Sequence, residues 1–372
     1  MRISREKVCS AWLAKAMLPY QVVEALLDIY GNPENVYESF LRENERFAEG
    51  KLPERVYHTL SESSGTESMN RLASLMEKHD IDIMTCSDAE YPFLLKQISD
   101  MPSFLFYIGS REAFANERIS FVGTRSPSAK ARMATERITE RLSENGVSVV
   151  SGLAYGIDAA AHRGCLMGKS PTIAVLGCGL DLNYPAENET LRKKIIDKDG
   201  IIISEYFPGE KPVGWHFPYR NRIISGLSKA TVLMEARIRS GSMTTVRHAV
   251  NQGRDVYAWP NDPDSIYSEA AHELLREGAR YFLTADDLLE DLGISSVKAN
   301  AHGKAKVDMN EKLTPSQMKI MKVIEQGECG FDDIIVKTNI PPAEAVSELT
   351  MLQIMCKITV LPGKRYALSL IN

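Results

Sequence analysis

The amino-acid sequence predicts an α/β protein with a large, mostly parallel β-sheet covered by helices on both faces. Two observations support this fold class. From Ile119 onward, short runs rich in Val, Ile and Leu alternate with segments of helical spacing. These runs are apolar almost throughout, as expected for parallel strands that are buried on both faces. With 372 residues, the chain is long enough for further modules on either side of the sheet.

The composition is that of an ordinary globular protein. Hydrophobic residues make up 44% of the chain and charged residues 25%, and the formal net charge is −5. No run approaches the roughly 18 apolar residues of a membrane span, and the N-terminus lacks the apolar region of a signal peptide. The six cysteines form no C-x-x-C pair, so we expect no zinc site, no disulfide framework and a cytoplasmic location. The mildly acidic total argues against nonspecific coating of nucleic acid but allows a local basic groove.

Residues 1–85 are expected to form a helical module. Val8, Ala11 and Trp12 recur at helical spacing, and Pro19 stops that helix and can begin the next one. The module shows no pattern of residues that points to chemistry. A packing or dimerisation role is therefore favoured for it.

Residues 86–293 are expected to form the sheet domain, with a connection at 86–118 that holds a short strand at 104–108. The strands expected beyond this connection cover 119–122, 147–150, 172–176, 201–204, 231–234 and 255–259. Helical segments such as 129–144 and 157–167 lie between them. Ligands of such sheets bind beyond the carboxyl ends of the strands, so those ends are the first place to look for a site.

The end of the chain is expected to form a separate module. Residues 294–312 are polar, small and aperiodic, which is typical of a linker. In residues 313–372, three helical segments precede a hairpin with a turn at Pro362–Gly363, a pattern typical of a winged-helix domain. The candidate recognition helix, 343–349, carries two acids and no base. This favours protein contact or packing over the reading of duplex DNA.

The most unusual charge distribution lies between Arg220 and Arg254. Seven basic residues and a single acid, Glu235, occur there, against the acidic balance of the whole chain. The turn Ser240–Gly241–Ser242 follows a buried strand and can open a helix, whose N-terminus attracts anions. We therefore expect one wall of an anion-binding mouth here. The alternatives are a solvated basic face and a helix cap without a ligand.

Two strand ends earlier in the chain also carry residues suited to binding an anion. Gly123 lets a ligand approach the backbone, Thr124 offers a hydroxyl, and Arg125 can hold a phosphate by two hydrogen bonds. Ser151 and Gly152 precede a helix rich in small residues, whose N-terminus suits an anion. The alternative for the first segment is an ordinary strand-to-helix turn with a surface arginine.

Enzyme chemistry is not expected from the motifs. The chain contains no G-x-G-x-x-G, no G-x-x-x-x-G-K-[ST], no G-x-S-x-G and no H-E-x-x-H. Asp158 and His162 lie four residues apart on one helical face, which allows acid–base or metal chemistry. A structural pair is favoured, with the aspartate supporting the helix start and the histidine packing. We expect no cofactor and no metal.

Taken together, these segments resemble the DNA processing protein A family (DprA/Smf). The resemblance extends over roughly Tyr91 to Phe282, and its segments occur in the family's order. It is carried by Tyr91–Pro92, Phe121–Arg125, Ser151–Asp158, Thr172–Asp181, Ile203–Glu205, Phe217–Ser228, Glu235–Ala236 and Ser240–Ser242. It implies an extended Rossmann-like domain between a SAM-like helical domain and a winged-helix domain.

The same resemblance implies a function. Family members bind single-stranded DNA without sequence preference, protect incoming DNA during natural transformation and competence, and load the RecA recombinase for recombination. They act as dimers and are not established enzymes. Phosphates are expected against the backbone and the basic side chains, and Phe217 or Tyr155 can stack a base. The expected site consists of Gly123, Thr124, Arg125, Ser151, Gly152, Phe217, Arg220, Asn221, Arg222, Ser240, Gly241 and Ser242.

Two other readings stay open. The nucleotide-processing phosphoribohydrolases of the LOG group have a related Rossmann-like fold and a G-G-x-G-T-x-x-E loop. The corresponding turn here, Ser240–Thr245, lacks the second Gly-Thr and the glutamate. A regulatory scaffold, whose basic groove recognises a protein or a small anion, is the third possibility.

Overall fold

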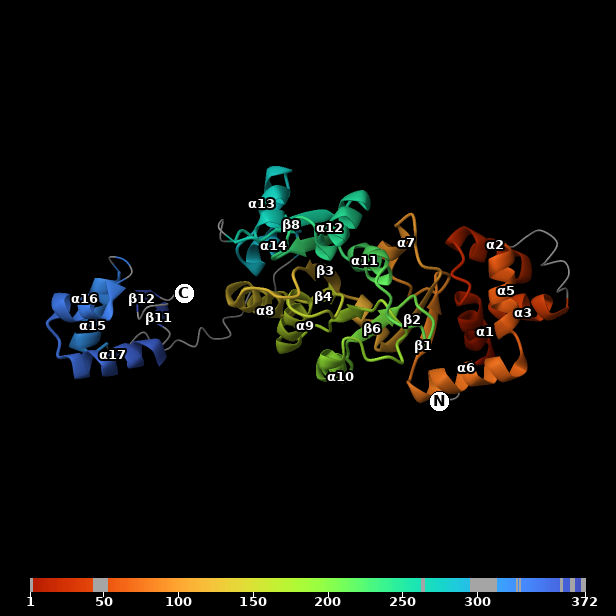
Figure 1. Cartoon of the computed structure of the whole chain (residues 1–372), viewed down its shortest axis with the longest axis horizontal. Helices are drawn as coiled ribbons and strands as arrows, with labels where there is room; N and C mark the ends of the chain where they lie inside the picture. The colour runs from red at the N-terminus through yellow and green to blue at the C-terminus, as the bar shows by residue number, and fades with distance from the viewer. Residues whose placement is uncertain are drawn as a thin grey trace. The chain divides into compact units, whose positions relative to one another are not determined.

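A computed structural model describes residues 3–42, 53–261, 265–294, 313–325, 327, 329–354, 357–361 and 365–368. The chain forms two compact units, Met1–Lys298 and Ala299–Asn372. The first unit contains the N-terminal helices and a nine-stranded sheet, and the second contains three helices and a three-stranded sheet (Figure 1). Apart from Ile294, the expected linker 294–312 falls outside the described residues.

The N-terminal helices pack around Trp12, which is almost fully buried. Its indole N–H donates to the Leu60 carbonyl at 3.0 Å, and its ring makes edge contacts with Tyr37 and Phe40. The described helices of this module are α1 (Arg5–Ala14), α2 (Tyr20–Tyr30), α3 (Pro33–Arg42), α5 (Glu54–Ser63) and α6 (Thr66–Lys78). Their core continues into the sheet at Ile83, so the module packs directly on the sheet domain.

The large sheet has the strand order β1-β2-β6-β5-β4-β3-β7-β8-β9. Its strands are β1 (Asp82–Thr85), β2 (Phe104–Gly109), β3 (Glu117–Val122), β4 (Val147–Ser151), β5 (Ile173–Val175), β6 (Ile201–Ser204), β7 (Ala230–Leu233), β8 (Asp255–Ala258) and β9 (Arg280–Tyr281). All pairs from β6 to β9 are parallel, which confirms the predicted mostly parallel sheet.

The sheet starts earlier in the chain than the sequence pattern indicates. Strands β1 and β2 pair antiparallel with each other, and β2 pairs antiparallel with β6. In β1, Ile83 packs into the core beneath the N-terminal helices, whereas Met84 packs into the core on the other face. Because both faces are covered, this short strand belongs to the sheet and not to the helical module.

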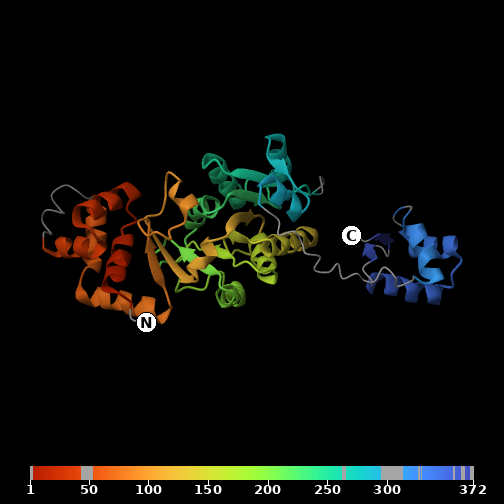
Figure 2. The same cartoon turned by 180° about the vertical axis from the view of Figure 1, so that it is seen from behind.

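Helices cover both faces of the sheet (Figures 1 and 2). Successive residues of β5 show the division: Ile173 and Val175 face one core, and Ala174 faces the other. The core that contains Ile173 and Val175 also includes residues of α7 (Phe93–Lys96), α11 (His216–Gly226), α12 (Gly241–Asn251) and α13 (Glu269–Arg276). The opposite face is covered by α8 (Ala129–Glu144), α9 (Ile157–Met167), α10 (Glu189–Asp197) and α14 (Ala285–Asp291).

The strand order contains a switch point between β3 and β7. The chain proceeds from β3 through β4 and β5 to β6 in one direction, and then returns to place β7 on the other side of β3. Open parallel sheets bind ligands in the crevice beyond the carboxyl ends at such a point. Gly123 directly follows β3 there, and Glu235 lies close behind β7.

The second unit has its own hydrophobic core. It contains α15 (Pro315–Ile324), α16 (Phe331–Thr338), α17 (Pro342–Ile354) and a sheet of β10 (Cys329–Gly330), β12 (Arg365–Leu368) and β11 (Ile358–Leu361). Strands β11 and β12 pair antiparallel as expected, while the turn at Pro362–Gly363 lies outside the described residues. The winged-helix assignment stays a prediction.

Among the described residues, none of the helices is long and apolar enough to cross a membrane.

Candidate functional site

A cavity of about 720 Å³ opens at the switch point of the sheet. Its wall is built from the loop after β3, the start of α9, the start of α11 and the N-terminus of α12. Most of the residues expected at the site line it: Gly123, Thr124, Arg125, Phe217, Arg220, Asn221, Ser240, Gly241 and Ser242. Gly152 lines a smaller pocket that shares Arg125, Phe217 and Arg220 with the cavity.

The loop after β3 is fixed by bonds to distant segments. The Thr124 N–H donates to the Glu235 carbonyl at 2.6 Å, and the Ser242 hydroxyl donates to the Gly123 carbonyl at 2.7 Å. A Cβ at Gly123 would lie 2.5 Å from a side-chain carbon of Ile157, so only glycine fits there. The loop is therefore held between β7, α9 and α12.

Arg125 is the exposed cation of this loop. Its side chain has no hydrogen-bond or ion-pair partner in the part of the chain that the structure describes. It lines both the cavity and the smaller pocket beside it. A guanidinium held by a rigid loop and left unpaired is available to an anionic ligand.

Arg220 lies at the floor of the cavity and is only 4% exposed. Its guanidinium donates to the Val175 carbonyl and, at 3.3 Å, to the Gly152 carbonyl. A Cβ at Gly152 would lie 2.7 Å from Arg220 Nη2 and 2.8 Å from Asp158 Oδ2, so this glycine leaves the space that both side chains need. The carboxylate of Asp158 accepts from the N–H of Gly152 at 3.2 Å.

Burial dominates the electrostatics of this floor. It raises the pKa of Asp158 above its ordinary value, although the charge of Arg220 and the N–H groups of Ala154 and Gly152 act to lower it. Burial likewise lowers the pKa of Arg220. Both shifts indicate that the free-energy cost of removing the two charges from water exceeds the free energy gained from their attraction.

The N-terminus of α12 forms the opposite wall. Ser240 is the N-cap residue, but its side chain makes no capping bond, and its buried hydroxyl has no partner among the described residues. The first N–H groups of a helix have no acceptor within it and carry the positive end of the helix dipole. Asn221 ties this helix to α11 by donating to Thr244 Oγ1 at 2.8 Å and to the Gly241 carbonyl at 3.2 Å.

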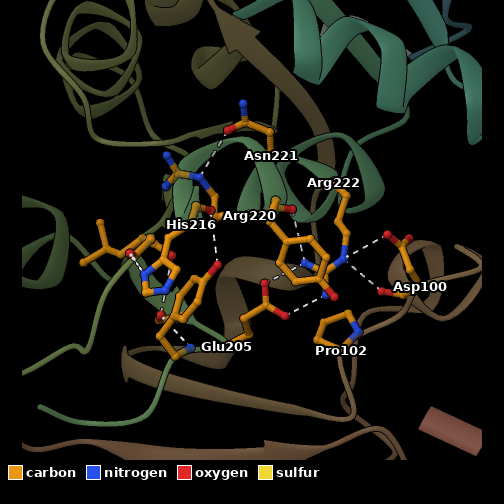
Figure 3. Close-up of polar contacts among 12 residues, drawn as sticks. Asp100, Pro102, Glu205, His216, Arg220, Asn221 and Arg222 are labelled. Atoms are coloured by element: carbon orange, nitrogen blue, oxygen red, sulfur yellow. Dashed lines mark hydrogen bonds and ion pairs between the residues drawn. The ribbon is translucent and has the colours of Figure 1, made fainter. Parts of the chain in front are cut away.

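Arg222 does not line the cavity, and its expected place there needs correction. Figure 3 shows it pointing to a different side of α11 from Arg220, as expected for residues two positions apart on a helix. It forms two 2.6 Å bonds with the carboxylate of Glu205, and its Nε donates to the Asp100 carbonyl at 3.0 Å. Its side chain is 2% exposed and lies 4.0 Å from the ring centre of Tyr219. Arg222 thus anchors α11 and has no free hydrogen-bonding edge at the cavity.

Ser151 also lies outside the cavity. The residue is fully buried at the end of β4, and its hydroxyl donates to the Phe121 carbonyl at 2.7 Å. It ties β4 to β3 and so supports the loop that carries Arg125.

The structural reading of Asp158 and His162 fits the geometry. His162 is fully buried, and its Nδ1 lies 2.7 Å from Thr172 Oγ1. Burial lowers the pKa of His162 to about 3, and the charges of Arg163 and Arg220 contribute in the same direction, so the ring is neutral at physiological pH. No group of three or more potential metal ligands occurs in the described part of the chain.

Aromatic rings complete the cavity. Phe217 and Tyr184 lie with ring centres 5.4 Å apart and an interplanar angle of 32°, and both line the cavity. Tyr184 is not among the residues that the sequence predicted for the site. Tyr155 lines only the smaller pocket, where its hydroxyl contacts Glu187. Two partly accessible rings beside an arginine are suited to unpaired bases next to a phosphate.

A family model described as DNA recombination-mediator protein A matches residues 82–293 of this chain. The DNA processing protein DprA of Streptococcus pneumoniae (strain ATCC BAA-255 / R6) is 41% identical over 201 residues, which cover 54% of this chain and 71% of that protein. The X-ray structure of DNA processing protein A from Streptococcus pneumoniae matches with a TM-score of 0.65 and 32% identity, covering 78% of this chain and 99% of that one.

A second solved structure is DNA processing protein A from Helicobacter pylori, described for its single-stranded DNA binding mode. It matches with a TM-score of 0.51 and 27% identity, covering 56% of this chain and 95% of that one.

Proposed function

Because this chain belongs to the DNA recombination-mediator protein A family, we propose that it binds single-stranded DNA, without sequence preference, in the cavity beyond β3 and β7. The Helicobacter pylori relative, whose structure describes single-stranded DNA binding, supports this ligand. In this proposal the bound DNA is incoming or recombining DNA, which the protein protects and on which it loads the RecA recombinase.

The unpaired Arg125 at the cavity mouth carries the proposal. Its guanidinium would take a phosphate, and the N-terminus of α12 with the Ser240 hydroxyl would take the same or a neighbouring phosphate. Contacts of this kind recognise the backbone and not the base edges, which gives binding without sequence preference. We leave Arg222 out of the proposed site because Glu205 occupies its guanidinium.

The aromatic rings supply the preference for single strands. Phe217 and Tyr184 both line the cavity, and a base stacks on an aromatic ring only when it has left its own stack. A duplex keeps its bases paired and offers only its backbone. The cavity would therefore retain the phosphate contact with duplex DNA but lose the stacking contribution, which is about 1–3 kcal/mol per base.

RecA loading and homodimer formation are parts of the proposal that rest on family membership. With these two activities, the protein would act in natural transformation and recombination, in the cytoplasm. The RecA recombinase and a second copy of this chain are the partners to test. The second unit is proposed to contribute protein contacts, since the described exposed residues of α17 include Glu344 and no basic residue.

The test compares fluorescein-labelled oligo(dT) with a duplex of equal length in anisotropy titrations at several salt concentrations. We expect tighter binding to the single strand and an affinity that falls linearly with salt on logarithmic axes. RecA filament formation on the coated strand is the second measurement. Equal affinity for the two DNAs, or no salt dependence, would contradict the proposal. Release of free base from nucleoside monophosphates would favour the phosphoribohydrolase reading instead.

A further inference from the structure

Trp215 is an exposed aromatic residue that the fold does not need. Its residue surface is 59% exposed, whereas Trp12 is 1% exposed and Trp259 is 7% exposed. It belongs to none of the described hydrophobic cores. An indole exposed to this degree is open to stacking by the ring of a ligand.

Trp215 lies at the rim of the DNA cavity. Gly214, directly before it, and Phe217, two residues after it, both line the cavity, and so does Pro212. Trp215 is the N-cap residue of α11, the helix that also carries Phe217 and Arg220.

The indole is held by a rigid neighbour. Its ring meets His216 edge to face, with centres 4.2 Å apart and an interplanar angle of 83°. His216 is 2% exposed, stacks on Tyr206 with centres 4.0 Å apart, and has its Nδ1 3.1 Å from the Gly177 carbonyl. A ring fixed in this way loses little conformational entropy when a second ring stacks on it.

We propose that Trp215 is a stacking platform for a nucleobase of the strand outside the cavity. The inference rests on the proposed single-stranded DNA binding and adds a second base contact to the one at Phe217 and Tyr184. Base–aromatic stacking accepts every base, so this contact keeps the binding independent of sequence.

The first test uses the intrinsic tryptophan fluorescence of the full chain. The chain has three tryptophans, and two are buried away from solvent, so stacking on Trp215 quenches the exposed fraction of the signal. Unlabelled oligo(dT) should quench wild-type fluorescence, and W215F should bind the oligonucleotide without that quench. An unquenched wild type that is shown by anisotropy to have bound the DNA would overturn the stacking role.

The second test separates bases from backbone. W215A should bind oligo(dT) roughly five- to tenfold more weakly than wild type. For an abasic oligomer of equal length, W215A and wild type should have the same affinity, since no base is there to stack. The matched control is F93A, which removes an aromatic residue that is 71% exposed and does not line the cavity, and it should change neither affinity.

The outcomes distinguish the role of Trp215 from the proposed binding of single-stranded DNA in the cavity. An equal loss for W215A on both oligomers, or no loss on oligo(dT), would overturn the role of Trp215 while leaving the cavity proposal intact. Failure of wild-type protein to bind oligo(dT) at all would overturn the proposed function itself. W215F serves as the second variant if W215A proves unstable, because it retains a ring at the same position.

Discussion

Three arginines near the cavity have the same side chain but lie in different environments. Arg125 is exposed and unpaired within the described structure, Arg220 is buried against backbone carbonyls, and Arg222 is buried against Glu205. Their availability to a phosphate falls in that order, because each bond to the protein occupies part of a fixed set of donors. At the residue scale, the function therefore depends on which guanidinium the fold leaves free.

Gly152 makes the floor of the cavity possible. In Gly152→Ala the new methyl group would meet Arg220 and Asp158 at less than 3 Å, and Arg220 cannot move freely because it bonds the Val175 carbonyl. We expect the unfolding free energy to fall by about 1–3 kcal/mol, as in overpacked cores, and single-stranded DNA affinity to fall with it. Denaturant unfolding and anisotropy titration measure the two effects.

Gly241→Ala is the matched control for that variant. Gly241 lines the cavity beside that floor, but a Cβ there would meet nothing within 4 Å, and its backbone N–H is retained. Both the unfolding free energy and the affinity should stay close to wild type. If the two alanine variants behave alike, crowding at Gly152 is not what shapes the floor.

The sequence predicted the residue types at the site better than their orientation. Gly123, Arg125 and Gly152 were expected from the glycines and basic residue that follow strands, and the structure places them around the cavity. Arg222 was expected with Arg220 because both belong to the basic stretch and to the segment Phe217–Ser228 that carries the family resemblance. Its partners Glu205 and Asp100 are remote in sequence, so local spacing contained no signal of the ion pair.

At the scale of elements, α11 links the cavity to the N-terminal helices. Arg220 and Phe217 lie on its cavity side, while Arg222 lines a pocket of about 300 Å³ that also contains Leu18 and Tyr20 of the helical module. One helix therefore both holds the site and contacts the module. The anchoring of α11 by Arg222 is expected to fix the position of Arg220.

Removal of one partner of the Arg222–Glu205 pair should be costly. In Arg222→Met the carboxylate of Glu205, whose side chain is 7% exposed, is left buried without its cation. We expect a loss of about 3–5 kcal/mol in unfolding free energy, and partial recovery in the double variant Arg222→Met/Glu205→Leu. The salt dependence of DNA binding should remain that of wild type, since this arginine holds no phosphate.

An exposed arginine provides the comparison. Arg280 lies 4.0 Å from Asp255 with its side chain 52% exposed, so Arg280→Met should cost at most about 1 kcal/mol. A change in the salt dependence of DNA binding in Arg222→Met, with little loss of stability, would show that Arg222 contacts DNA after all.

Elements with strong periodicity were predicted well. Helix α8 runs from Ala129 to Glu144 and helix α9 from Ile157 to Met167, as the spacing of apolar residues indicates. Strands β1 and β9 were not predicted, because such short strands at the edges of the sheet have no alternation long enough to identify them. Strand β2 was expected as a short strand at 104–108, but as part of a connection and not of the sheet. The membership of β1 and β2 depends on the cores that cover both of their faces, which form only through tertiary contacts.

At the scale of the whole molecule, the parallel sheet brings distant segments to one edge. The bond from the Ser242 hydroxyl to the Gly123 carbonyl joins residues 119 positions apart. The rule that strand ends meet at one edge predicted this proximity from the order of strands and helices alone. It did not predict the size of the cavity or the ring pair of Phe217 and Tyr184, because both depend on how loops and side chains pack.

The central claim is that the fold leaves Arg125 free to hold a phosphate of single-stranded DNA. It is tested most directly by the slope of log affinity against log salt for wild type and Arg125→Ala, measured with oligo(dT) and the full chain. Arg137→Ala, which removes an exposed arginine from the middle of α8, is the control. We predict weaker binding by Arg125→Ala and a slope smaller by about 0.7, the value for one lost phosphate contact on a single strand, with no change in the control. An unchanged affinity and slope in Arg125→Ala would contradict the account.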